Sequence, residues 1–438
     1  MAGGRGGRAL SSDPVAEGLL RDLAPQVVGI LTRRSGDFTA AEDAVQEALV
    51  AAHTTWPREG IPDHPRAWLV TTATRRLVDE QRSAAARRRR ERDWAATQPD
   101  GAEVAQHDDS LTVLLMCCHP VLSPASAVAL TLRAVSGLTT TEIATAYLVP
   151  ESTMAQRISR AKRTLRESGA TFELPATDEL GERVRRALAV VYLLYNEGYA
   201  ASSGAQLTRT DRSAEAIRLG RLVHRVLPDD PEATSLLALM LLLDARRPAR
   251  VTASGDLVTL AEQDRSLWDR ALVAEGTALL HSTIGAGRGP GEYQVQAAIA
   301  AVHDRAPTAA DTDWPQVLAL YGLLEEVAPS PFVTLARAVA LAEAEGPDAA
   351  GPVLDGLDAA LGDHQRLHAV RGHVAQLRGD RAEARRHYLA AAARATNLAE
   401  QRHLTRLAAG LSDLSDLSDP ADLSDSGTPR GRGSPTSG

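Results

Sequence analysis

Apolar residues recur every three or four positions along most of this chain, a spacing that places them on one side of an α-helix. The segment from Glu151 to Glu167 shows this most clearly, since its apolar stripe consists of Met154, Ile158, Ala161 and Leu165. The opposite face carries polar and basic side chains, namely Ser152, Gln156, Ser159, Arg160 and Arg163. We therefore predict an amphipathic helix with a polar and basic outer face.

A shorter helix is predicted just before it. Thr139 can cap the first amides of that helix, and Glu142, three residues later, can complete a capping box. The helix ends at Val149, because the residue before a proline is pushed out of helical geometry. Two short helices with a tight turn and a polar second face indicate a helix-turn-helix that reads DNA in the major groove. For this stretch alone, an ordinary helical hairpin with a solvated basic face is the alternative.

The N-terminal part of the chain, from Pro14 to about Arg92, is predicted to form three or four helices. The pattern places them at 15–31, 39–54 and 66–92. Three prolines and a glycine exclude helix between Trp56 and Pro65. The last helix leads into the block Arg87–Arg90, and an arginine-rich helix after an aromatic loop favours nucleic-acid contact over a plain solvated helix end.

The helix at 39–54 carries an acidic patch of Glu42, Asp43 and Glu47. Asp43 and Glu47 are four residues apart and therefore neighbours on one helical face. Paired carboxylates can perform acid-base catalysis, but that chemistry needs a pocket and a partner, which the surrounding sequence does not suggest. We interpret the patch as a solvated face or as a docking surface for a basic partner.

A different helical array is predicted for 177–410, where helix pairs are separated by proline or glycine. In the last pair, Gly379-Asp380 turns the chain, and the following helix is similar to the second helix of a tetratricopeptide unit at Glu383, Ala384, Tyr388 and Ala391. Stacked pairs of this kind form concave surfaces for peptides or partner domains. The aromatic cluster from Tyr192 to Tyr199 is expected in the core rather than in a ligand pocket.

Composition supports an all-α fold, since aromatic residues are only 3% and helical spacing dominates. We find no apolar run of about eighteen residues that could span a membrane, and expect a cytoplasmic protein.

Cys117 and Cys118 lack zinc-site spacing and are expected to be buried thiols. Lys162 is the only lysine, does not fit a Walker A loop, and is expected on an exposed basic flank. We expect no cofactor, no metal and no enzymatic activity.

The resulting domain order has six parts. We predict a disordered leader at 1–13, a helical domain at 14–92, a linker at 93–109, a helix-turn-helix domain at 110–170, a helical-repeat extension at 177–410 and a disordered tail at 411–438.

Three segments in this order resemble the bacterial extracytoplasmic-function (ECF) sigma factors of the sigma-70 family. They are AEDAVQEALVAA (41–52), PRAWLVTTATRRLVDEQRSAAARRRR (65–90) and GLTTTEIATAYLVPESTMAQRISRAKRTLRE (137–167). The extension resembles the subgroup with a C-terminal tetratricopeptide-like domain, through VYLLYNEGY (191–199), EQDRSLWDR (262–270) and APSPFVTLARAVAL (328–341). The resemblance implies a subunit that recruits core RNA polymerase to promoters and opens DNA.

The resemblance also implies particular residue roles. Asp43, Gln46 and Glu47 would bind the clamp coiled coil of the polymerase β′ subunit, and the helix-turn-helix domain would lie at the β flap. The downstream promoter element would be opened and read by the loop 56–65 and by Arg75, Asp79 and Arg82. The upstream element would be contacted by Ser152, Thr153, Gln156, Arg157, Arg160 and Arg163. The extension would bind a protein partner or contact the rest of the chain.

Two departures and two alternatives accompany this interpretation. Many such factors carry a basic residue at the position of Ala155 and a small one at Gln156, so promoter preference cannot be transferred. Helical winding places Trp68 at the edge of the DNA face, whereas the family implies a core position.

A conventional helix-turn-helix regulator with a helical sensor domain is the alternative function. An enzyme is a third class, supported only by scattered histidines without metal-site spacing.

Overall fold

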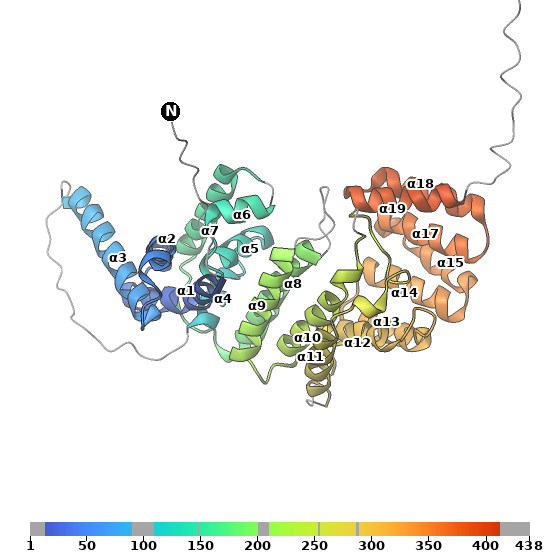
Figure 1. Cartoon of the computed structure of the whole chain (residues 1–438), viewed down its shortest axis with the longest axis horizontal. Coiled ribbons are helices and arrows are strands. Elements are labelled where there is room, and N and C mark those ends of the chain that lie inside the picture. The colour runs from blue at the N-terminus through green and yellow to red at the C-terminus, as the bar shows by residue number, and fades with distance from the viewer. Residues whose placement is uncertain are drawn as a thin grey trace, which may run out of the picture. The chain divides into compact units, whose positions relative to one another are not determined.

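The computed structural model describes residues 14–89, 109–147, 149–199, 210–252, 255–285 and 289–411 (Figure 1). Over these residues the regular structure consists of helices α1 to α19, two short 3₁₀ helices and an isolated β-bridge between Val251 and Leu257. The predicted all-α class is therefore confirmed. Among the described helices, none combines the length and apolar character needed to cross a membrane. The predicted leader, most of the linker and the tail beyond Leu411 lie outside the described residues.

The chain divides into two compact units. The first contains α1 to α11 and most of α12, and the second contains 248–268, the end of α12 and α13 to α19. Within the first unit, the helices at the blue end of the colour bar form an N-terminal bundle and the next four form a second bundle (Figure 1).

The N-terminal bundle consists of α1 (Pro14–Ser35), α2 (Phe38–Glu59) and α3 (Pro65–Arg89). Asp37 starts α2 by accepting hydrogen bonds from the amides of Thr39 at 2.9 Å and Ala40 at 3.1 Å. The three helices bury an apolar core between them, which includes Leu20, Val27, Leu31, Val45, Leu49, Leu69, Ala73 and Leu77.

One boundary of this bundle was predicted wrongly. Helix α2 continues through Trp56 and Pro57 to Glu59, so only the stretch from Gly60 onwards is a loop. Pro57 removes a single backbone donor from the last turn. The burial of Trp56, which is 4% exposed, and a hydrogen bond from the Gly60 amide to the Trp56 carbonyl at 2.9 Å stabilise that turn instead.

The second bundle consists of α4 (Ser110–Cys117), α5 (Pro124–Ala134), α6 (Thr140–Tyr147) and α7 (Glu151–Glu167). Ser123 caps α5, since its hydroxyl accepts from the Ser126 amide at 3.3 Å. The predicted capping box of α6 is also confirmed. The Glu142 carboxylate accepts from the Thr139 amide at 2.8 Å, and the Thr139 hydroxyl accepts from the Glu142 amide at 3.2 Å.

The first unit continues into the extension with α8 (Thr177–Tyr199), α9 (Thr210–Val226), α10 (Pro231–Ala245), α11 (Arg270–Ser282) and α12 (Glu292–Arg305). Neighbouring helices pack from α8 to α11, and α8 also packs on α4 and α5 of the second bundle. Tyr195 is fully buried, and Tyr192 packs edge-to-face on Tyr293 with ring centroids 5.4 Å apart. The expected core position is therefore confirmed for Tyr195, whereas Tyr192 is half-buried and the side chain of Tyr199 lies outside the described residues.

The second unit stacks α13 (Trp314–Val327), α14 (Pro331–Glu345), α15 (Pro347–Gly356), α16 (Asp358–Leu361), α17 (Gln365–Leu377), α18 (Arg381–Arg394) and α19 (Leu398–Gly410). The turn predicted at Gly379-Asp380 is confirmed: Gly379 has φ +81°, and Asp380 caps α18. Tyr388 is buried and packs on Gly372 of α17, where a Cβ atom would lie 2.8 Å from the tyrosine ring. Gly372 therefore permits the close approach of α17 and α18.

The segment EQDRSLWDR contributes a polar anchor to the second unit. The buried Arg265 guanidinium donates to the carbonyl of His303 at 2.7 Å and to that of Ala306 at 2.5 Å. The same group lies 4.7 Å from the ring centre of Trp268, which is 3% exposed. Arg265 thus fixes the end of α12 within this unit.

Candidate functional site

Helix α7 presents the outer face that its sequence predicts. The stripe of Met154, Ile158, Ala161 and Leu165 is buried, at 4% exposure or less. The side chains predicted to contact DNA point away from it, and Ser152, Thr153, Gln156, Arg160 and Arg163 are exposed while Arg157 is half-buried. A helix that buries one stripe and exposes amides, hydroxyls and guanidinium groups on the other can donate to phosphates and base edges.

Helix α3 carries the second predicted DNA surface. Arg75 and Asp79 are exposed, whereas the side chain of Arg82 lies outside the described residues. Trp68 is half-buried and packs edge-to-face on Trp56, with ring centroids 5.6 Å apart. Trp68 therefore supports the end of α2 and lies between the edge position that winding predicts and the core position that the resemblance implies.

The residues predicted to dock on polymerase lie on α2 but in different surroundings. Glu47 is exposed, with an ion pair to Arg76 at 3.5 Å, and the Asp43 side chain is 48% exposed. Gln46 is only 5% exposed, and its amide nitrogen donates to the Arg133 carbonyl of α5 at 2.8 Å. Part of the predicted docking face is thus covered by the second bundle.

A buried ion cluster, which the sequence did not predict, lies between α2 and the second bundle. Glu42 of α2 is 0% exposed and is paired with Arg133 at 3.2 Å and with the ammonium group of Lys162 on α7. Lys162 also donates to Asp43 at 2.7 Å. The expectation of an exposed Lys162 was therefore wrong. Lys162 follows Ile158 by one helical turn, at the edge of the apolar stripe, and the acidic patch of α2 covers that edge.

We call this contact between the N-terminal bundle and the second bundle the seam, defined by Glu42, Asp43, Gln46, Arg133 and Lys162. Gly137, with φ +69°, closes the seam nearby. A Cβ atom there would lie 3.2 Å from Ala24 of α1 and 3.2 Å from Leu49 of α2. Only a residue without a side chain fits both the backbone conformation and the close approach.

The end of the predicted linker is also fixed to the N-terminal bundle. Asp109 is 2% exposed and accepts from the guanidinium Nε of Arg33 on α1 at 3.1 Å. A Cβ atom on Gly29 would lie 2.4 Å from the Asp109 Cβ atom. Residue 29 therefore has to lack a side chain for Asp109 to reach Arg33. The chain therefore enters the second bundle from a point anchored on α1.

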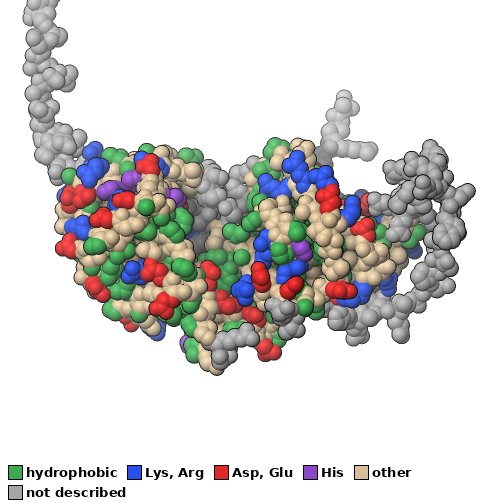
Figure 2. Space-filling model, turned by 180° about the vertical axis from the view of Figure 1, so that it is seen from behind, with side chains coloured by type: hydrophobic (Ala, Val, Ile, Leu, Met, Phe, Trp, Pro, Cys, Tyr) green, Lys and Arg blue, Asp and Glu red, His purple; other side chains and the backbone are tan. Residues whose placement is uncertain are grey.

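The adjacent cysteines are free thiols and both are buried, as predicted. Burial raises the pKa of Cys118 to about 12 and also raises the pKa of Cys117. Over the described residues, no group of three or more His, Cys, Asp or Glu side chains is arranged to hold a metal ion. On the face of the molecule in Figure 2, both acidic and basic side chains are spread over the surface.

Comparison with known proteins explains the two bundles. Residues 19–88 match the model of Sigma-70 region 2, and residues 112–165 match the model of Sigma-70, region 4. The chain belongs to the sigma-70 family. Within this sigma factor, region 2 corresponds to the N-terminal bundle and region 4 to the second bundle. Residues 183–284 of the extension match a family of unknown function (DUF6596).

Two relatives place the sigma factor more closely. It is 39% identical over 392 residues to "Uncharacterized protein R00370" of Rhizobium meliloti (strain 1021), covering 87% of this chain and 92% of the relative. It is 33% identical over 150 residues to "Probable ECF RNA polymerase sigma factor SigI" of Mycobacterium tuberculosis (strain CDC 1551 / Oshkosh), covering 32% of this chain and 51% of that protein. No solved structure matches the chain. It is an ECF-type sigma factor that directs transcription and carries a C-terminal helical extension.

Proposed function

We propose that this sigma factor docks on core RNA polymerase through the face of α2 that carries Asp43, Gln46 and Glu47. The polymerase surface would be the clamp coiled coil of the β′ subunit, with region 4 at the β flap. The observation that supports this is the position of an exposed carboxylate, Glu47 at 63% exposure, within the matched region 2. An acidic, partly exposed helical face is suited to a basic partner.

The proposed promoter contacts use the two exposed polar faces. Arg75, Asp79 and Arg82 of α3, with the loop from Gly60 to His64, would act on the downstream element. The outer face of α7 would read the upstream element in the major groove, chiefly through Gln156 and Arg160. Gln156 lies in the first half of α7, the part of a recognition helix that contacts bases, and Arg160 follows it by about one helical turn on the same exposed face.

For the extension we propose a regulatory or partner-binding role, without chemistry of its own. In the second unit each helix packs on its neighbours along the chain, and stacks of helix pairs commonly bind other proteins, which supports the proposal. Its first helix also packs on region 4: Arg183 donates to the Leu115 carbonyl at 3.2 Å, and Arg186 donates to the Leu122 carbonyl. We expect the whole protein to act in the cytoplasm, where core polymerase works.

Charge reversal at Glu47 tests the docking face. Glu47→Arg should weaken binding to core polymerase by about tenfold or more, because it places a positive charge opposite a basic surface of the partner. Glu59→Arg is the matched control, since Glu59 is an exposed glutamate at the far end of the same helix. Promoter-specific transcription with purified core polymerase should fall in parallel. Equal core affinity of the two variants would instead favour a conventional regulator without polymerase docking.

Alanine substitution on α7 tests the DNA face. Gln156→Ala and Arg160→Ala should each cost about 1–3 kcal/mol in discrimination between cognate and altered upstream elements. Arg166→Ala, at the exposed C-terminal end of the same helix, should leave that discrimination unchanged. A specificity profile of Gln156→Ala and Arg160→Ala identical to that of the native protein would exclude this face as the promoter reader.

A further inference from the structure

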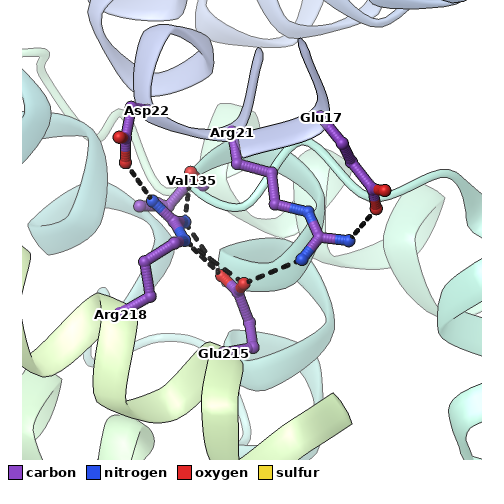
Figure 3. A network of polar contacts seen from close by, with 6 residues as sticks. All are labelled: Glu17, Arg21, Asp22, Val135, Glu215 and Arg218. Atoms are coloured by element: carbon purple, nitrogen blue, oxygen red, sulfur yellow. Dashed lines mark hydrogen bonds and ion pairs between the residues drawn. The ribbon is translucent and has the colours of Figure 1, made fainter. Parts of the chain in front are cut away.

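Helix α9 of the extension lies where region 2 meets region 4, and one of its side chains contacts both. The guanidinium group of Arg218 donates to the Asp22 carboxylate of α1 at 3.1 Å and to the Val135 carbonyl, at the end of α5, at 3.3 Å (Figure 3). Asp22 belongs to region 2 and Val135 to region 4. A single arginine of the extension thus ties the two promoter-binding parts of the chain together.

Glu215 holds Arg218 in this position and adds a second connection to region 2. It accepts from Arg218 at 2.8 Å and is paired with Arg21 of α1 at 3.7 Å (Figure 3). Arg21 is in turn paired with Glu17 in the previous helical turn. The Glu215 side chain is 4% exposed and that of Arg218 is 20% exposed, so solvent screens these charges only weakly.

We propose that α9 is a latch that holds regions 2 and 4 in a closed pair, in which the seam covers part of the polymerase-docking face. This inference rests on the proposed role of α2 in docking. The closed pair would bury Gln46 and engage Asp43, so core polymerase and region 4 would compete for the same side of α2. The partner of the α9 surface is therefore the sigma factor itself.

The contacts also indicate which part of the latch breaks on opening. Helix α8 is bonded to region 4 through Arg183 and Arg186, and Arg218 bonds to region 4 through the Val135 carbonyl. The extension contacts region 2 through the pairs of Asp22 and Arg21 with α9. Region 4 and α8–α9 would consequently separate from region 2 together, and these two pairs would be lost. Because they exist only in the closed form, they shift the equilibrium towards it.

Two variants on opposite sides of the latch and one control test the proposal in the full-length chain. Arg218→Ala removes the link from α9, and Asp22→Asn removes it from α1 with little risk to folding, because the Asp22 side chain is 55% exposed. Arg221→Ala is the matched control. Arg221 is on the same helix, but its ion pair, at 3.0 Å, is with Glu275 of α11 inside the extension. Circular dichroism should confirm an unchanged helix content for all three.

The first readout needs no polymerase. Fluorescent labels at Glu59→Cys on α2 and Glu167→Cys on α7, both exposed positions, report the separation of regions 2 and 4 by energy transfer. We expect lower transfer efficiency for Arg218→Ala and Asp22→Asn than for the native chain, and native efficiency for Arg221→Ala. Equal efficiency in all four proteins overturns the latch.

The second readout is the apparent affinity for core RNA polymerase. Each latch variant should bind core polymerase about five- to tenfold more tightly than Arg221→Ala, because a larger fraction of the free chain is open. If the latch variants show lower energy transfer but bind core polymerase with the affinity of the native chain, region 4 and core polymerase do not compete for α2. If Glu47→Arg bound core polymerase as tightly as the native chain does, the proposed docking face on α2 would be refuted. The energy-transfer measurement would still test whether α9 holds regions 2 and 4 together.

Discussion

Replacing Lys162 by methionine should open the seam between regions 2 and 4 more strongly than any change on the surface. In the closed form Glu42 is 0% exposed and is neutralised by Lys162 and by Arg133 at 3.2 Å. Methionine keeps most of the volume of lysine but leaves Glu42 with Arg133 alone. Removing one partner of a buried pair costs about 3–5 kcal/mol, and the remaining arginine places this case near the lower end.

This cost applies only to the closed form, because Glu42 becomes hydrated when regions 2 and 4 separate. A shift of about 3 kcal/mol corresponds to roughly a hundredfold change in the closed-to-open equilibrium. Lys162→Met should therefore raise the apparent affinity for core polymerase by up to that factor, limited by the fraction of native chain that is already open. Binding is measured by fluorescence anisotropy of the labelled chain titrated with core polymerase.

Arg163→Met is the control for this prediction. Arg163 is the next residue, its side chain is 65% exposed, and its pair with Glu167 at 3.9 Å is a surface pair of little consequence. Arg163 is also a predicted DNA contact, so the comparison is made without DNA. If Lys162→Met and Arg163→Met bind core polymerase equally, the buried cluster does not hold the chain closed and the reasoning from Glu42 fails.

Two further predictions concern the stability of the second unit. Gly372→Ala should destabilise it by about 1–3 kcal/mol, because the added methyl group would lie 2.8 Å from the Tyr388 ring. Gly322→Ala is the control: no atom lies within 4 Å of the added methyl group, so this change should stabilise α13 by up to about 1 kcal/mol. Urea denaturation that ranks the two variants in the opposite order contradicts this packing. Burial lowers the pKa of both His403 and His387 below the ordinary value of 6.5, so the unfolded chain takes up protons first as the pH falls. The melting temperature of this unit should consequently drop as the pH is lowered through about 6.5, and His403→Gln should flatten that dependence; a pH-independent melting temperature over this range argues against it.

Much of the fold could be predicted because local signals agree with tertiary packing. The Thr139–Glu142 capping box, the apolar stripe of α7 and the Gly379-Asp380 turn depend on residues a few positions apart, and the structure places them as predicted. The end of α2 was missed because proline is a strong local breaker, while the burial of Trp56 that opposes it depends on residues from another helix.

The seam could not be predicted for the same reason. Glu42 and Lys162 are 120 positions apart, and each taken alone reads as a surface charge on an amphipathic helix. Only the packing of α2 against α7 shows that they meet in a buried pair. The single lysine in a chain otherwise rich in arginine was the one available signal, and it carried no indication of its partner. The latch at Arg218 likewise depends on contacts across 196 positions.

In the proposed mechanism, one side of α2 contacts region 4 in the free chain and core polymerase in the complex. Energy transfer between labels at Glu59→Cys and Glu167→Cys, measured in the otherwise native chain before and after saturation with core polymerase, tests it most directly. We expect high transfer in the free chain and a marked loss on binding, because region 4 leaves α2. Unchanged transfer in the polymerase-bound chain would contradict it.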